Sequence, residues 1–165
     1  MTPDESTKTL ETGRKRPSKD VYYLGIAKAV LRRSTCLRRQ YGAVIVKDDE
    51  IIATGYNGSP RGEENCIDVG ICWRRAHNIE HGERQELCRA VHAEENAVIS
   101  ASRHDMQGST LYLYGMEDGR DMEKPEPCIA CKIRIKNAGI ARVVTIANAE
   151  RGDTSDKQRP TDNEK

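Results

Sequence analysis

Two short segments carry side chains whose types and spacing could hold a metal ion. His92 is followed two residues later by Glu94, and Cys128 and Cys131 stand three residues apart further along the chain. One imidazole and two thiolates are ligands that zinc prefers, and three protein ligands leave the fourth tetrahedral position open for water. Glu94 could take a proton from that water and return it to a substrate nitrogen. The four residues together predict a catalytic zinc site.

Each part of this set has an ordinary explanation when it is taken alone. A single C-x-x-C pair can be redox-active, and a single histidine is more often a hydrogen-bonded residue than a metal ligand. A purely structural zinc would be expected to use a fourth protein ligand, and neither segment supplies one. The combination therefore favours the catalytic interpretation.

Both segments are predicted to open a helix. The run from His92 to about residue 104 has helical spacing, and Pro127 suits the first turn of a second helix, from 128 to about 138. Residues three apart project from one face of a helix, so Cys128 and Cys131 can bind the same ion. We expect the two helix N-termini to meet at the zinc, where their dipoles stabilise the thiolates.

The other periodic segments predict a sheet that these helices must cover. A helix is expected from Ser18 to about Ser34, and strand-like runs occupy residues 41–46, 51–56, 110–114 and 140–146. Residues 47–50 have the composition of a hairpin turn, so the first two strands should be antiparallel, whereas helical crossovers make another part of the sheet parallel. We therefore expect an α/β protein, a three-layer α/β/α sandwich with a mixed central sheet of about five strands.

Length and composition predict one folded domain, residues 18–147, between polar tails at 1–17 and 148–165. No apolar run approaches the ~20 residues of a membrane span, and the N-terminus lacks the apolar core of a secretory signal, so we expect a cytoplasmic protein and no membrane partner. The formal net charge of +1 disfavours broad nucleic-acid binding. A small anionic ligand needs only a local basic cluster and stays compatible with this charge.

Four stretches resemble the deoxycytidylate (dCMP) deaminases, within the zinc-dependent cytidine and deoxycytidylate deaminase superfamily. They are residues 34–46, 54–62, 86–97 and 127–139. The last two contain the H-x-E and P-C-x-x-C patterns of zinc-dependent nucleobase deaminases. The Gly-Tyr-Asn-Gly-x-Pro-x-Gly stretch at 55–62 is specific to the dCMP group. The resemblance runs from about Ser18 to Ile146 and implies the cytidine-deaminase fold.

This resemblance implies zinc-dependent hydrolytic deamination of dCMP to dUMP, the precursor of thymidylate. His92, Cys128 and Cys131 would hold the zinc, which provides a hydroxide for attack on C4 of cytosine. Glu94 would carry the proton to N3 and then to the departing ammonia.

The resemblance also implies contacts to the substrate. The Ala93 amide would meet the base carbonyl, the Glu126 carbonyl would meet the exocyclic amine, and Asn57 would contact the sugar. The phosphate donor is left open among three nearby arginines, which suit phosphate through bidentate hydrogen bonds: Arg38, Arg39 and Arg61.

Members of this group are often hexamers that dCTP activates and dTTP inhibits. Arg103 resembles the position tied to this control, although an ordinary exposed helix arginine would explain it equally well. We therefore expect a homo-oligomer with dCTP and dTTP as candidate effectors.

Four further cysteines flank or lie within the irregular segment 63–90: Cys36, Cys66, Cys72 and Cys88. So long a segment without periodicity needs additional interactions to stabilise it, and zinc binding supplies folding free energy. The resemblance places Cys36 and Cys66 where some dCMP deaminases hold a second, structural zinc. We predict a closed tetrahedral site from the four cysteines, with His77 or His81 as a substitute for one, against the alternative of buried free thiols.

Residues 115–126 depart from the family pattern, in which the preceding strand runs within a few residues into Pro-Cys. A loop at the mouth of the site could reshape recognition of the base or phosphate. Two alternatives therefore stay open. One is a deaminase of another nucleotide, nucleoside or RNA adenosine, and the other is a non-catalytic, zinc-stabilised nucleotide-binding module, against which Glu94 argues.

Overall fold

The computed structural model of the chain describes residues 16–80 and 82–149. The two predicted polar tails, residues 1–17 and 148–165, lie almost wholly outside this range, so the domain limits stay a prediction. Helix α7 (Ile146–Ala149) runs into the region expected to be the second tail and buries Ala149. No helix among the described residues is long and apolar enough to cross a membrane.

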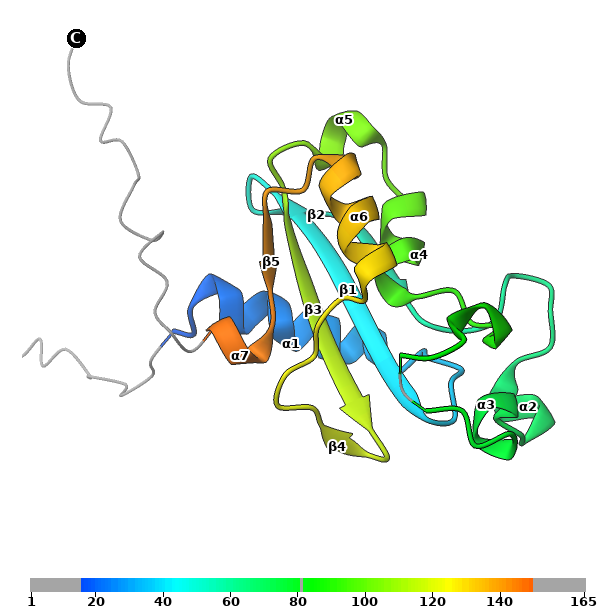
Figure 1. Cartoon of the computed structure of the whole chain (residues 1–165). Helices are drawn as coiled ribbons and strands as arrows, with labels where there is room; N and C mark the ends of the chain where they lie inside the picture. Colours follow the sequence, from blue (N-terminus) through cyan, green and yellow to red (C-terminus); the bar gives the residue numbers. More distant parts are fainter. Residues whose placement is uncertain (1–15, 81, 150–165) are drawn as a thin grey trace, which may run out of the picture.

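A five-stranded mixed sheet forms the centre of the fold (Figure 1). Its strands are β1 (Arg39–Lys47), β2 (Glu50–Tyr56), β3 (Thr110–Glu117), β4 (Arg120–Asp121) and β5 (Arg142–Val144). β1 lies between β2 and β3 and is antiparallel to both, whereas β5 runs parallel to β3. The predicted mixed sheet with a hairpin and a parallel part is therefore confirmed.

Helices cover both faces of this sheet, which confirms the predicted three-layer sandwich (Figure 1). One face carries α1 (Lys19–Leu31) and α7, and the other carries α4 (Ala93–Ile99), α5 (Arg103–Met106) and α6 (Ile129–Ala138). Side chains alternate across a strand, so Ala43 and Ile45 of β1 join the core under α4 and α6. Val44 and Val46 join the separate core under α1.

Two strand glycines let helices approach the sheet backbone to backbone. A Cβ atom added at Gly42 in β1 would lie 2.1 Å from the Ala27 carbonyl oxygen of α1. One added at Gly55 in β2 would lie 2.2 Å from the Ala93 carbonyl oxygen and 2.4 Å from the Ala97 nitrogen of α4. Any larger side chain would push the helix away, so Gly55 fixes the distance between β2 and the start of α4.

The segment expected to be irregular, residues 63–90, contains three short elements: α2 (Cys66–Val69), α3 (Trp73–Ala76) and the 3-10 turn η1 (Gln85–Leu87). Two backbone hydrogen bonds between Gly58 and Val91 join the ends of this excursion, at 3.2 and 2.8 Å. A third bond, from the Ile67 amide to the Thr35 carbonyl, ties α2 to the chain before β1. The excursion therefore leaves after β2 and returns immediately before His92.

Three local predictions were wrong. The strand expected at 140–146 is shortened to β5, because helix α7 begins at Ile146. The helix expected from 92 to about 104 ends at Ile99, and a new helix begins after Ser102, whose hydroxyl caps it by accepting from the Asp105 amide at 3.1 Å. The loop expected at 115–126 begins as a hairpin, because β3 continues to Glu117 and turns into β4. The turn residues Asp118 and Gly119 both have positive φ, as a two-residue hairpin turn requires.

Candidate metal centre and active-site pocket

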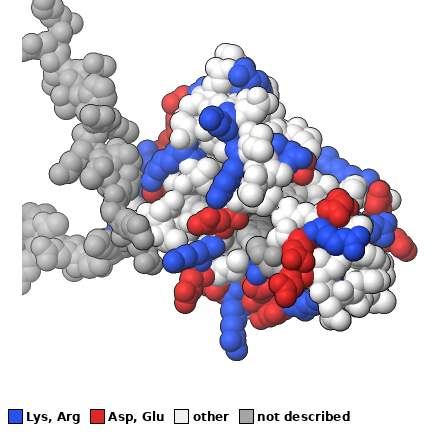
Figure 2. Space-filling view, in the orientation of Figure 1, with Lys and Arg blue, Asp and Glu red and all other residues white. Residues whose placement is uncertain are grey.

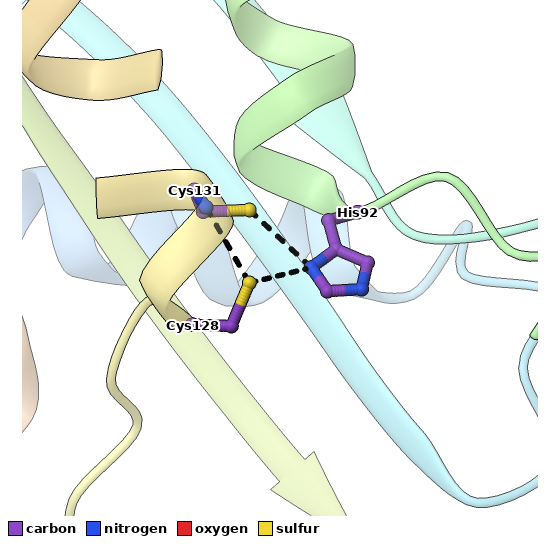
Figure 3. A group of neighbouring side chains, drawn as sticks. All are labelled: His92, Cys128 and Cys131. Atoms are coloured by element: carbon purple, nitrogen blue, oxygen red, sulfur yellow. Dashed lines mark hydrogen bonds between the residues drawn. The ribbon is translucent and has the colours of Figure 1, made fainter. Parts of the chain in front are cut away.

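Three side chains from two helix starts converge on one point in the structure (Figure 3). His92 Nδ1 lies 3.5 Å from Cys128 Sγ and 3.3 Å from Cys131 Sγ, and all ligand atoms of this group lie within 4.8 Å of one another. Tetrahedral zinc with ordinary Zn–S and Zn–N bonds would hold sulfur and nitrogen about 3.5 Å apart. The three residues therefore fit zinc in both chemistry and spacing, and they leave one coordination position for a fourth ligand.

The ends of two helices create this convergence, as the sequence predicted. His92 is the N-cap residue of α4, and Cys128 is the N-cap residue of α6. The Cys128 sulfur accepts a hydrogen bond from the Cys131 amide at 3.4 Å, so the first turn of α6 fixes the spacing of the two thiols. Amides in the first turn of a helix lack intrahelical partners and favour the negative charge of thiolates.

Glu94 lies in the first turn of α4 and only 5% of its surface is exposed. Burial raises the pKa of its carboxyl above the usual value. Burial and the charge of Glu94 raise the pKa of the Cys131 thiol. A bound dication would oppose both effects on the thiol, because a coordinating thiol is deprotonated. Glu94 therefore stands as a buried acid beside the metal ligands.

A cavity of about 440 Å³ opens beside this cluster. Its lining includes residues that the sequence analysis assigned to the catalytic zinc or the substrate: Arg38, Arg39, Asn57, His92, Ala93, Glu94, Glu126 and Cys128. Three cysteines that were predicted for the second zinc also line it: Cys36, Cys72 and Cys88. Other lining residues were not predicted, among them Tyr41, Arg74, Gln85, Met122, Lys124 and Lys132. Arg61, Cys66 and Arg103 do not line this cavity. Of the three candidate phosphate donors, the structure therefore brings only Arg38 and Arg39 to the site.

Both of these arginines already have an acidic partner. Arg39 makes two hydrogen bonds to the Glu117 carboxylate, at 2.7 and 3.0 Å, and Arg38 Nε lies 3.7 Å from the same group. The Arg39 guanidinium holds the pKa of Glu117 below its usual range. Glu117 follows Arg39 by 78 residues, so no local pattern could have revealed the pair.

Asn57 lines the cavity, but its side chain mainly joins two backbone segments. Its Oδ1 accepts from the Tyr41 amide at 2.8 Å and from the Ser34 hydroxyl at 2.7 Å, while Nδ2 donates to the Arg39 carbonyl at 2.7 Å. One N–H of the amide is left for a ligand. The predicted contact to the sugar therefore stays compatible with the structure, and Asn57 also holds the start of β1 in place.

Two other predicted residues interact within the protein. The exposed Glu126 carboxylate lies 3.3 Å from Lys132 Nζ at the start of α6. Arg103 Nε donates to the Asn137 carbonyl at 3.3 Å, which links α5 to α6. The predicted roles of the Glu126 carbonyl in binding the amine and of Arg103 in regulation stay predictions.

The four remaining cysteines are neighbours, but they do not form a compact ligand set. Burial raises the pKa of Cys66, and Cys36, Cys88 and Cys72 raise it further, so these three thiols lie within electrostatic reach of Cys66. Among the described residues, only His92, Cys128 and Cys131 form a group of three or more whose ligand atoms lie within 4.8 Å. The second zinc therefore stays a prediction.

His77 of that segment has partners other than a metal ion. His77 stacks on Trp73 with ring centroids 3.9 Å apart, and its Nδ1 lies 2.8 Å from the Trp73 carbonyl oxygen. His81 falls outside the described residues. The backbone geometry of α3 therefore explains the position of His77 without a metal ion.

Comparisons with known proteins agree with this site. Residues 17–147 match the family described as the cytidine and deoxycytidylate deaminase zinc-binding region. The chain is 41% identical over 134 residues to a deoxycytidylate deaminase of Mycobacterium phage D29, with 78% of the chain and 94% of that protein covered. It is 38% identical over 135 residues to a deoxycytidylate deaminase of Schizosaccharomyces pombe. There the match spans 82% of the chain but only 39% of the longer relative.

A solved structure shares the architecture. The crystal structure of dCMP deaminase from the cyanophage S-TIM5 in apo form is 26% identical, with a TM-score of 0.57 over 79% of this chain and 84% of that one. The family match covers nearly all of the described residues, including both helix starts that carry the metal ligands. The chain therefore belongs to the cytidine and deoxycytidylate deaminase family.

Proposed function

We propose that this protein catalyses the zinc-dependent hydrolytic deamination of dCMP to dUMP. The observation that carries the proposal is the convergence of His92, Cys128 and Cys131 beside the buried Glu94, next to a cavity of about 440 Å³. Cavities of this size suit small ligands. The relatives that are named deoxycytidylate deaminases support dCMP as the substrate.

Zinc on these three ligands would lower the pKa of a water molecule toward neutrality and so supply the nucleophile. Glu94 is positioned to carry the proton to N3 of the ring and then to the leaving ammonia. Its burial keeps bulk water from competing for that proton. Ala93 begins α4 and lines the cavity, so its amide can donate to the base carbonyl.

The charge around the cavity supports a nucleotide over a nucleoside. Five cationic side chains line it, against the carboxylates of Glu94 and Glu126: Arg38, Arg39, Arg74, Lys124 and Lys132. Glu117 offsets part of this charge at Arg38 and Arg39, and the positive charge that remains attracts a phosphate group. The face drawn in Figure 2 intersperses basic and acidic side chains over its described part, without a continuous basic stripe, which argues against an RNA substrate.

We also propose that the protein is a cytoplasmic homo-oligomer. Three isoleucines on α4 and α6 are largely exposed: Ile99 at 71%, Ile129 at 79% and Ile133 at 65%. Exposed apolar residues of this size on adjoining helices favour a protein interface. All six cysteines are unpaired, as a reducing compartment would keep them. The proposed effectors are dCTP and dTTP.

A substrate panel tests the proposed function. Zinc-loaded protein is incubated with dCMP, CMP, deoxycytidine, cytidine and AMP, with and without dCTP or dTTP, and ammonia release is measured. We expect dCMP to have the highest kcat/KM, with Glu94→Gln as the inactive control. A higher kcat/KM for another nucleotide would support a deaminase but replace dCMP as its substrate. Failure to deaminate any nucleotide would overturn the proposal in favour of a binding module.

A further inference from the structure

The hairpin that departs from the family pattern is held against three different elements by its own acidic residues. Glu117 pairs with Arg39 of β1, and Asp118 lies 2.6 Å from Arg75 Nη2 in α3. Asp121 lies 2.8 Å from Lys28 Nζ in α1. The hairpin is thus connected to the sheet, to the helix beneath it and to the excursion at 63–90.

The chain after the hairpin is also held in place. The Met122 amide donates to the Gly115 carbonyl at 3.0 Å, and Pro125 is fully buried. A Cβ atom at Gly115 would lie within 3.0 Å of the Tyr41 ring, the Met122 sulfur and Pro125. Lys124 therefore lies between Met122, which is bonded to Gly115, and the buried Pro125, and it lines the cavity.

Lys124 differs from the other cations that line the cavity. Arg39 and Arg38 face Glu117, Arg74 donates to the carbonyls of Glu80 and Glu83, and Lys132 pairs with Glu126. The part of the chain that the structure describes gives Lys124 neither an ion pair nor a hydrogen bond. Its ammonium is exposed and can turn toward a ligand without losing an existing partner.

We propose that Lys124 binds the 5′-phosphate of the substrate and makes the enzyme prefer a nucleoside monophosphate over a nucleoside. The inference rests on the proposed function and deepens it. A lysine ammonium binds phosphate as a point charge with three donors. Using Arg39 instead would remove Glu117 from the bond that holds the hairpin. Using Lys132 would separate it from Glu126.

The test compares Lys124→Ala with Lys136→Ala. Lys136 is an exposed lysine of α6 that does not line the cavity, so its removal changes the net charge equally. The readout is kcat/KM for dCMP divided by kcat/KM for deoxycytidine. We expect this ratio to fall about tenfold in Lys124→Ala, mainly through KM for dCMP, which is the low end for a hydrogen bond to a charged group. Lys124→Arg should restore most of it.

A binding measurement separates this inference from the proposed function. Isothermal titration calorimetry follows dUMP and deoxyuridine with the full-length zinc-loaded protein and each variant. Selective loss of dUMP affinity in Lys124→Ala, growing smaller at high salt, supports the inference even if wild type deaminates no substrate. Wild-type turnover of dCMP with an unchanged ratio and unchanged dUMP affinity in Lys124→Ala overturns the inference and leaves the proposed function standing. If folded wild type binds neither ligand and deaminates no nucleotide, both the inference and the proposed function are overturned.

Discussion

Gly55 lies where strand β2 and helix α4 meet backbone to backbone, so Gly55→Ala tests whether this contact positions the metal ligand and Glu94. The new Cβ would lie 2.2 Å from the Ala93 carbonyl oxygen and 2.4 Å from the Ala97 nitrogen. Neither atom is on a flexible side chain. Since an ordinary contact needs about 3.4 Å, the start of α4 must retreat by about 1 Å.

That shift is large compared with what the site tolerates. Metal ligand distances must hold within about 0.2 Å, and a misplacement of about 1 Å at a reacting group can cost about 10²-fold in rate. Overpacking of this kind costs about 1–3 kcal/mol of stability. For a chain of this length each kcal/mol lowers Tm by about 2–4 °C. We expect weaker zinc binding, a kcat lower by about 10²-fold and a Tm lower by several degrees.

Two glycine variants provide matched controls. At Gly42 a Cβ would lie 2.1 Å from the Ala27 carbonyl oxygen, so Gly42→Ala should destabilise the protein through α1, on the opposite face, without moving the zinc ligands. Gly25 in α1 has no heavy atom within 4 Å of an added Cβ, so Gly25→Ala should stabilise the helix by about 0.5–1 kcal/mol. Zinc affinity by competition with a chelator, kcat and Tm are measured for all three. Equal losses of zinc affinity in Gly42→Ala and Gly55→Ala would refute the reasoning.

Three further predictions follow from the site and the second core. Glu94→Gln should lower kcat by about 10²–10⁴-fold while the zinc content stays unchanged in metal analysis. If the Glu94→Gln protein instead turns over dCMP at the wild-type rate, Glu94 has no part in the mechanism. Chelation should abolish activity, and added zinc should restore it in wild type but not in Cys131→Ser. Burial and Asp20 raise the pKa of Tyr112, so its contribution to stability is complete below about pH 10 and is lost as pH rises further. Between pH 9 and 12 the Tm should therefore fall less steeply with pH for Tyr112→Phe than for wild type. Parallel curves of Tm against pH would contradict this.

The fold and the metal cluster could be predicted because both depend on local signals. Each ligand segment opens a helix, and a helix start fixes the geometry of its own first residues, while the packing of α4 and α6 on the sheet brings the two starts together. The break after Ile99 carried a local signal as well, since Ser102 and Asp105 form a capping pair. The apolar residues before and after this pair continue the helical spacing, so the pattern predicted one uninterrupted helix.

The sequence analysis did not predict the hairpin at 117–121, although its turn residues are Asp118 and Gly119. Asp-Gly is a strong hairpin signal when alternating apolar residues flank it. Here the flanks are Glu117 and Arg120, which are charged, so the composition indicated a loop. The pairing is stabilised instead by partners from far along the chain, such as Lys28 and Arg75.

The substrate contacts were harder to predict than the chemistry for the same physical reason. Arg38 and Arg39 are predicted phosphate donors because arginine suits phosphate, yet Glu117 pairs with both guanidinium groups in the folded protein. Whether a cation is available to a ligand depends on which acids the fold brings to it. Glu117 reaches both arginines because β3 pairs with β1, a strand far away in the sequence. A charge pattern therefore locates the cations near a site, but only the folded structure distinguishes those already neutralised from one, such as Lys124, that can still bind a phosphate.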